Sequence, residues 1–147
     1  MFLLKRVSVI SICLLSLSCS SMGGTSISSD NVAVRVGANV LQDKDKLEEL
    51  QERETVETIH RYVTHRFRKL NVRKTLKFDI TITSIRLRTN MFSGGPDHIN
   101  ADVIVTENGN EIKTFSTNIT TTRSRSSAVK RMSKGLAKRI YEEIKDL

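Results

Sequence analysis

Cysteine is nearly absent from this chain, and both of its cysteines stand close to the N-terminus. Cys13 and Cys19 are the two thiols among 147 residues. From Ser20 onward the sequence has no cysteine. A domain folded from that part forms no disulfide and has neither a thiolate nucleophile nor a cysteine-based metal site.

The chain also lacks an apolar run long enough to remain in a membrane. The apolar stretch Val7–Leu17 has 11 residues, whereas a spanning helix needs about 20. This stretch follows the positive pair Lys5 and Arg6 and precedes the small residue Ser18, which is the three-part pattern of a secretory signal. We therefore predict that residues 1–18 are a signal peptide, which is removed on export.

The end of this signal carries a second pattern. Residues 15–19 read LSLSC, which resembles the lipobox of bacterial lipoproteins, with Ser16 standing where Leu is usual. The resemblance implies that the sulfur of Cys19 is lipidated and that Cys19 becomes the mature N-terminus. Because Ser20 follows it, the sorting rule of that family implies the outer membrane, with the domain facing the periplasm. The alternative is an ordinary signal peptide in which Cys19 is incidental.

Tryptophan is missing, and aromatic residues make up 5% of the chain. No aromatic platform for stacking nucleotide bases is evident in such a sequence. Together with the predicted export, this disfavours nucleic acid as a partner.

Catalytic motifs are missing as well. The sequence contains no G-x-S-x-G, no H-E-x-x-H and no glycine-rich phosphate loop that opens a helix. His60 and His65 fall on different sides of one predicted helix and His98 lies far away in sequence, so the histidines do not converge on a metal ion. We therefore expect a protein that is not an enzyme and that uses no metal or other cofactor.

After Cys19 the sequence changes from tether to domain. Residues 20–30 read SSMGGTSISSD, in which eight of eleven residues are Ser, Gly or Thr, a composition typical of a flexible linker. We predict a lipidated cysteine and tether over residues 19–31 and a single domain over 32–147.

Alternating apolar and polar residues predict four strands in this domain. They begin at Val32, Leu76, Ile99 and Ile112, and Val32 to Val40 is read as one continuous alternation. The apolar residues stand at even positions up to Ile82 and at odd positions from Ile85 onward, which predicts a β-bulge near Thr83-Ser84. A second irregularity is expected between Ile112 and Phe115. Asn108-Gly109 predicts a hairpin turn.

Helical spacing of apolar residues predicts two helices. The first runs from about Asp45 to Leu70, with a wholly polar interruption at 51–55, and the second begins at a cap on Ser126 or Ser127 and continues to Leu147. In the second helix the bases come first and the acids last, which opposes the helix dipole. The resulting order, β-α-β-β-β-α, predicts an α+β two-layer sandwich with a four-stranded sheet and both helices on one face.

The domain is basic. The chain has 24 Lys and Arg against 16 Asp and Glu, and removal of residues 1–18, which include Lys5 and Arg6, leaves a net charge of +6. The bases form three groups along the sequence: Arg61, Arg66, Arg68, Lys69, Arg73 and Lys74; then Arg86 and Arg88; then Arg123, Arg125, Lys130, Arg131 and Lys134. Within the last two groups, the candidate anion or partner contacts are Arg86, Arg88, Arg123, Arg125, Lys130 and Arg131, and scattered solvated charge is the alternative.

A loop over residues 90–97 holds Met91 and Phe92 beside the only proline. Exposed apolar residues in a loop mark partner contacts, although these two residues can equally pack under the sheet.

These features favour a lipid-anchored module of the bacterial cell envelope. We expect it to bind or assemble with an envelope protein partner, without catalysis, while the anchor attaches it to the membrane. The element order also resembles that of small accessory lipoproteins of envelope assembly and secretion machines. The alternative is direct binding of an anionic envelope ligand, such as lipopolysaccharide, anionic lipid or a wall polymer, through the arginine clusters. A third hypothesis is a hydrolase with an unrecognised site.

Overall fold

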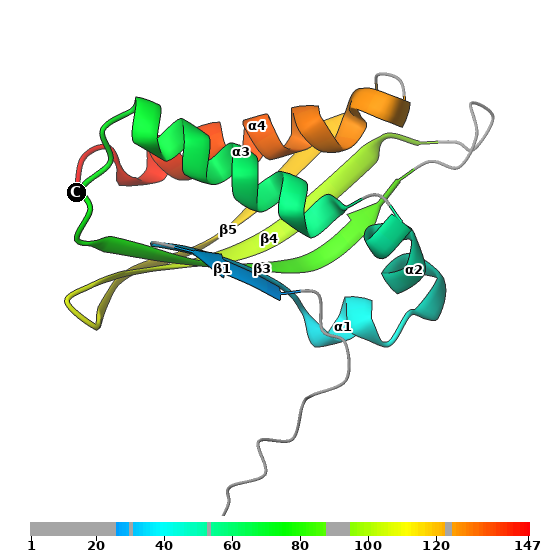
Figure 1. The fold of residues 1–147 in the computed structure, drawn as a ribbon, viewed down its shortest axis with the longest axis horizontal. Coiled ribbons are helices and arrows are strands. Elements are labelled where there is room, and N and C mark those ends of the chain that lie inside the picture. Colours follow the sequence, from blue (N-terminus) through cyan, green and yellow to red (C-terminus); the bar gives the residue numbers. More distant parts are fainter. Residues whose placement is uncertain (1–25, 30, 53, 88–94, 123–124) are drawn as a thin grey trace, which may run out of the picture.

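The computed structural model describes residues 26–29, 31–52, 54–87, 95–122 and 125–147. Its elements follow the order shown in Figure 1. They are β1 (Ser26–Ser29), β2 (Val32–Val36), α1 (Ala38–Leu41), α2 (Lys44–Glu52), α3 (Thr55–Lys69), β3 (Leu76–Arg86), β4 (Asp97–Glu107), β5 (Asn110–Thr121) and α4 (Arg125–Ile144).

The strands form one sheet in the order β1-β2-β3-β4-β5. β2 and β3 are parallel neighbours joined through α1, α2 and α3, and the other neighbouring pairs are antiparallel. α3 and α4 lie side by side over one face of the sheet, while α1 and α2 lie at one end of it (Figure 1). The predicted α+β two-layer class and the placement of two long helices on one face are therefore confirmed.

The sheet has one strand more than the four that we predicted. β1 lies within the expected tether, and Ser26 to Ser29 pair with Arg35 to Val32 at the edge of the sheet. Strand pairing uses backbone N–H and C=O groups, so a serine-rich sequence can add an edge strand without an apolar pattern.

The buried apolar side chains form a single cluster that extends from Val32 to Ile144. The inward residues of β2, β3 and β4 meet the apolar stripes of α3 and α4, in which Ile59, Val63 and Leu136 are fully buried. Because the core lies entirely within this range, we expect residues 26–147 to fold as a unit. No helix of the described segments combines the length and the apolar character needed to cross a bilayer.

The first strand is shorter than predicted. The alternation Val32 to Val40 suggested one continuous strand, but β2 ends at Val36 and Ala38–Leu41 form the short helix α1. Gly37 makes this change of direction. Its amide donates to the carbonyl of Ile82 at 2.8 Å, and a Cβ at this position would stand 3.0 Å from the same oxygen. Val40 remains buried, but it belongs to α1.

The first long helix is divided in two. We predicted one helix from Asp45 to Leu70, whereas α2 ends at Glu52 and α3 begins at Thr55. Glu54 takes a left-handed conformation with φ 47°, which helical backbone does not permit. The break falls in the polar interruption, where no apolar side chain holds the helix against the core.

The predicted irregularities of the sheet are confirmed. The register of β3 and β4 shifts between Ile82 and Ser84. In the pairing of β4 with β5, Val105 faces Lys113 and Thr106 faces Glu111, so Ile112 is the extra residue. The turn of this hairpin is Asn108-Gly109, with φ 52° and 84°, as two-residue hairpin loops require.

α3 ends in a Schellman motif. Asn71 adopts φ 51°, the amide of Val72 donates to the carbonyl of Phe67 at 3.1 Å, and the amide of Asn71 donates to that of Arg68 at 3.3 Å. This pattern satisfies the last carbonyls of a helix and reverses the chain. Asn is one of the few non-glycine residues that tolerate the left-handed position.

The last helix begins and ends slightly differently from the prediction. α4 includes Ser126 and Ser127, which we expected to cap it, because it already begins at Arg125. Its apolar stripe is buried as predicted through Ile144, but Leu147 is 45% exposed because the helix has ended by then. Gly135 lets α4 approach β5 closely, since a Cβ there would stand 3.0 Å from the Ile119 side chain.

Thr55 provides a test of this core. Its hydroxyl is buried and has no hydrogen-bond partner among the described residues. We expect Thr55→Val to raise the free energy of unfolding by about 1 kcal/mol, because an unsatisfied buried hydroxyl costs about 1–3 kcal/mol. Thr55→Ser keeps the hydroxyl and loses a methyl group, so it should lower the stability. Urea denaturation of residues 26–147 measures both variants, and a destabilised Thr55→Val contradicts this interpretation.

The Schellman motif gives a second prediction. Asn71→Ala should lower the free energy of unfolding by about 1 kcal/mol, because the left-handed conformation is costly for a Cβ-bearing residue other than Asn. Asn71→Gly should leave the stability equal or higher. Thermal denaturation compares them with Asn110→Ala, an exposed control at the start of β5. Equal stability of Asn71→Ala and Asn71→Gly would contradict the role of the backbone conformation.

Candidate functional site

Several residues that the sequence singled out lie outside the described residues. These are Cys19, Arg88, Met91, Phe92 and Arg123. Arg125 is the first residue of α4, and the structure describes its backbone alone. The roles assigned to these residues stay predictions.

The remaining candidates lie on two opposite faces. Lys130 and Arg131 are exposed on α4. Arg86 is exposed near the end of β3, between the buried Ile85 and Leu87, so it points away from the helix layer. Its guanidinium lies against the backbone of Gly95, where a Cβ would stand 3.1 Å from Nη1. Arg86 therefore does not join Lys130 and Arg131.

The structure instead brings Arg61 of the first basic group together with Lys130 and Lys134 of the third. Tyr62 of α3 lies beside α4, and three cationic groups approach its ring: Arg61 Cζ at 5.6 Å, Lys134 Nζ at 5.7 Å and Lys130 Nζ at 5.9 Å from the ring centroid. The negative face of an aromatic ring attracts cations at such distances. Lys130 and Lys134 can both reach one ring because residues four apart share a face of a helix. We call Arg61, Tyr62, Lys130 and Lys134 the helix-face cluster.

The positive charges of this cluster are not compensated by acids. Among the described residues, no ion pair joins Arg61, Lys130 or Lys134 to a carboxylate. Since each cationic group lies within 5.9 Å of the same ring centroid, no two are more than about 12 Å apart. At the largest of these separations two like charges repel by about 0.4 kcal/mol in water, and closer pairs repel more. The fold tolerates this repulsion, and an anion above the ring would meet three cations at once.

Some charges elsewhere on the surface are paired. Ion pairs join Lys113 to Glu143 at 2.9 Å and Lys145 to Glu142 at 2.7 Å, and hydrogen bonding from Lys145 lowers the pKa of the Glu142 carboxyl. The side chain of Lys46 likewise lowers the pKa of Asp43. On the open sheet face Arg35 pairs with Asp79. Exposed bases such as Lys44, Lys77 and Arg139 also lack an ion pair among the described residues, so what distinguishes the helix-face cluster is the approach of three cations to one ring.

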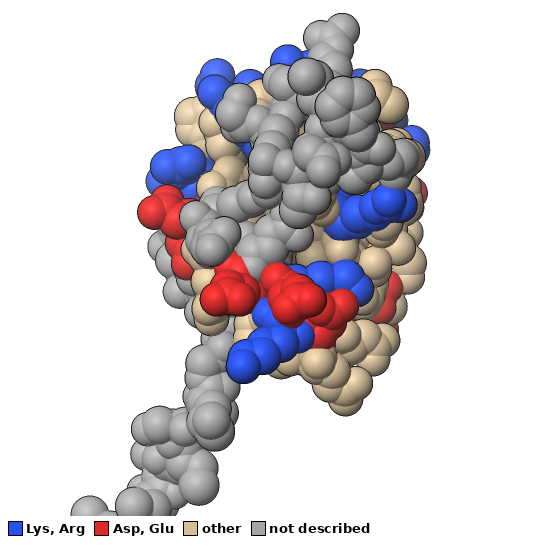
Figure 2. Space-filling model, turned by 90° about the vertical axis from the view of Figure 1, so that its right-hand side faces the viewer, with Lys and Arg blue, Asp and Glu red and all other residues tan. Residues whose placement is uncertain are grey.

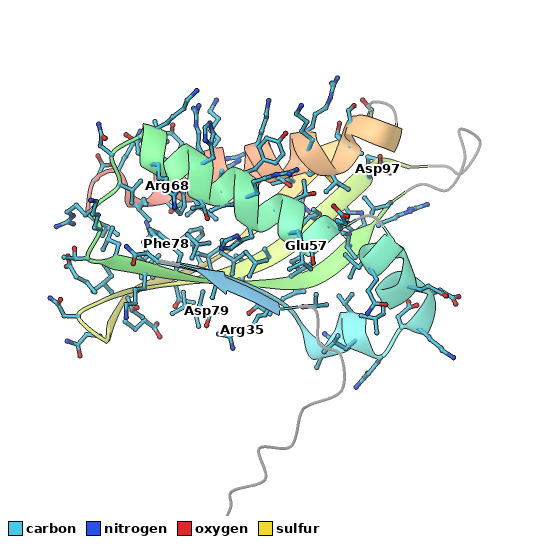
Figure 3. The ribbon with its side chains drawn as sticks, viewed as in Figure 1. Arg35, Glu57, Arg68, Phe78, Asp79 and Asp97 are labelled. Atoms are coloured by element: carbon cyan, nitrogen blue, oxygen red, sulfur yellow. The ribbon has the colours of Figure 1, made fainter. Side chains whose placement is uncertain are left out.

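The two layers differ in net charge. α3 and α4 hold ten Lys and Arg against three Asp and Glu, a net charge of +7. The five strands hold four bases against five acids, a net charge of −1. Figure 3 shows long nitrogen-tipped side chains rising from α3 and α4 on the side away from the sheet. In Figure 2, which views the end that carries α1 and α2, acidic side chains gather in the lower half with basic ones beside them, and further basic side chains lie along the upper edge and at both sides.

The direction of the helices explains the charge order of α4. α3 and α4 run in the same direction (Figure 1), so the acidic end of α4 lies toward the end of α3 that carries Arg66, Arg68 and Lys69. The acids at the end of α4, unfavourable for its own dipole, are therefore placed toward the bases of its neighbour.

Sequence patterns missed the central residue of this site. Tyr62 falls between apolar positions of α3 and looks like an ordinary half-buried aromatic. The signal that was present is the spacing of Lys130 and Lys134, which puts two cations on one helix face. Tyr62 lies 68 and 72 positions before these two lysines in the sequence. Their approach to its ring follows from the packing of α3 against α4, which no local pattern specifies.

Histidines and carboxylates of the described segments do not gather into a metal site. No group of three or more His, Cys, Asp or Glu side chains there is arranged to hold an ion. His60 Nε2 lies 3.2 Å from the carbonyl of Val32, and His98 Nε2 lies 3.4 Å from the Ser84 hydroxyl. Both imidazole rings therefore have polar groups of the polypeptide as neighbours.

A scan against protein-family models finds no match to this chain, and a search of curated proteins finds no match either.

Proposed function

We propose that this protein is a lipid-anchored, non-enzymatic binding module of the bacterial cell envelope, and that it binds an anionic envelope ligand through its helix face. The observation that carries the proposal is the helix-face cluster, in which three cations from two helices surround one ring without a neutralising acid. The net charge of +7 on the helix layer extends this surface beyond the cluster. The ligand chemistry that fits is repeated phosphate or carboxylate, as on anionic lipid headgroups or lipopolysaccharide.

The anchor belongs to the same proposal. Lipidation of Cys19 would attach the chain to the outer membrane, and residues 20–25 would lead to β1. A tethered domain meets ligands of that surface at a high effective concentration, so each individual contact can be weak.

A second candidate is assembly with an envelope protein through the open face of the sheet. Ile104 and Ile112 are exposed there, by 36% and 39%, among polar neighbours. Exposed apolar side chains suit a protein partner better than an anionic polymer. The two candidates use opposite faces of the domain and can be separated by variants.

Binding to anionic vesicles tests the leading proposal. We expect residues 26–147 to bind vesicles that contain phosphatidylglycerol more tightly than neutral vesicles, and binding should weaken as salt increases. Lys130→Gln with Lys134→Gln should lower the partition coefficient about 30-fold, because each basic residue near such a surface contributes about 1 kcal/mol. Co-sedimentation measures this quantity.

The matched control is Lys44→Gln with Lys77→Gln. It removes the same charge from exposed positions on α2 and on the open sheet face. We expect it to keep most of the binding. Equal losses in the two double variants would show that net charge alone is responsible and would refute the assignment to the helix face.

Mass spectrometry tests the anchor. The mature wild-type protein should begin at Cys19 and carry acyl chains, and it should fractionate with outer membranes. Cys19→Ala should leave the acyl mass absent and release the protein from the membrane fraction. A mature wild-type chain that starts elsewhere and carries no lipid would refute the lipidation of Cys19 while leaving the helix-face proposal open to its own test.

A further inference from the structure

A cavity of about 650 Å³ opens at the C-terminal end of α3, between that helix and the first residues of β2 and β3. Small-molecule sites in proteins commonly measure about 300–1,000 Å³. It is lined by Asn31, Val32, Thr64, Phe67, Arg68, Asn71, Val72, Arg73, Lys74, Leu76 and Phe78. None of the helix-face cluster is among these residues.

The Schellman motif shapes this cavity. The chain reversal at Asn71 carries Val72 back beneath the helix, and the next residues lead into β3. The Asn31 side-chain amide donates to the carbonyl of Lys74 and so joins the start of β2 to this returning segment. The wall is therefore fixed by hydrogen bonds at both sides of the opening.

One part of the lining is apolar. The rings of Phe67 and Phe78 are tilted by 50° with their centroids 4.6 Å apart. Phe67, Phe78, Val32 and Leu76 are 2–5% exposed, so only their edges reach the cavity, and the half-buried Val72 adds further apolar surface. Figure 3 places Arg68 on α3 and Phe78 on β3 at the same end of the molecule. Such a surface favours a hydrocarbon group over water.

The other part is cationic. Arg68, Arg73 and Lys74 line the cavity, and the described lining contains no Asp or Glu. The helix dipole favours a base in the last turn of α3, which accounts for Arg68. It does not account for Arg73 and Lys74, which follow the helix. Glu107 lies 3.8 Å from the exposed Arg73 guanidinium, a weak contact on an exposed side chain.

We propose that this cavity binds a single-chain anionic amphiphile, with its hydrocarbon chain against Phe67 and Phe78 and its phosphate or carboxylate group at Arg73 and Lys74. The positive charges of Arg73 and Lys74 favour an anionic headgroup. The rings of Phe67 and Phe78 favour a hydrocarbon chain. This site is independent of the helix face, because it takes one molecule into a cavity, whereas the helix face contacts an extended anionic surface.

Calorimetry with octyl phosphate tests the proposal on residues 26–147. Octyl phosphate should bind at least tenfold more tightly than octanol, which lacks the charge, and at least tenfold more tightly than inorganic phosphate, which lacks the chain. Octanoate serves as the second headgroup, and the tighter of the two anions identifies the preferred one. The proposal is overturned if octyl phosphate binds no more tightly than octanol or no more tightly than inorganic phosphate.

Two variants locate the binding. Arg73→Gln with Lys74→Gln should weaken octyl phosphate binding at least tenfold, while Lys69→Gln with Lys77→Gln, which removes equal charge nearby but outside the cavity, should change it less than twofold. Val72→Trp should fill the cavity and abolish binding. If Val72→Trp fails to fold, Arg73→Gln with Lys74→Gln decides alone, since both residues are exposed. Unchanged affinity for octyl phosphate in that double variant refutes the site.

The result is separable from the helix-face proposal. Lys130→Gln with Lys134→Gln should bind octyl phosphate as tightly as the wild type does, although it loses vesicle binding. A protein that binds vesicles but not octyl phosphate refutes the cavity proposal alone. A protein that binds octyl phosphate but not anionic vesicles refutes the helix-face proposal alone.

Discussion

The structure depends on the contact between the apolar stripes of α3 and α4 and one face of the sheet. Strands β2, β3 and β4 each turn their apolar residues to that side, and the helices cover them. Burial of this kind supplies the main stabilising free energy of a small domain. It also fixes the rotation of each helix about its axis. Once Val63 and Leu136 face the sheet, the bases between the apolar positions have only the outer surface to occupy.

Sequence patterns predicted the parts of the fold that depend on local periodicity. The change of parity around Thr83 gave the bulge, because a period of two makes any extra residue visible. Asn108-Gly109 gave the hairpin, because few other pairs accept positive φ at both positions. The inward faces of both long helices were equally predictable from the spacing of their apolar residues.

The remaining features depend on contacts that no local pattern records. β1 pairs through its backbone, so its serines give no strand signal. The break at Glu54 lies in a polar stretch that would also suit an exposed helix. Gly37 fits the alternation of a strand, and its turn depends on the bond from its amide to Ile82 across the crossover. At the candidate site the bases were predictable as groups along the sequence, but the meeting of Lys130 and Lys134 with Tyr62 requires the packing of α3 against α4.

The unequal charge of the two layers makes this domain an electric dipole directed from the sheet layer to the helix layer. Near an anionic plane such a body experiences a torque that turns the helix layer toward the plane and the sheet away from it. The effect begins at about one Debye length, roughly 8 Å at physiological ionic strength, and so precedes any specific contact. Orientation would then be established by the field during approach, and the open sheet face would be presented outward, available to whatever lies on the other side.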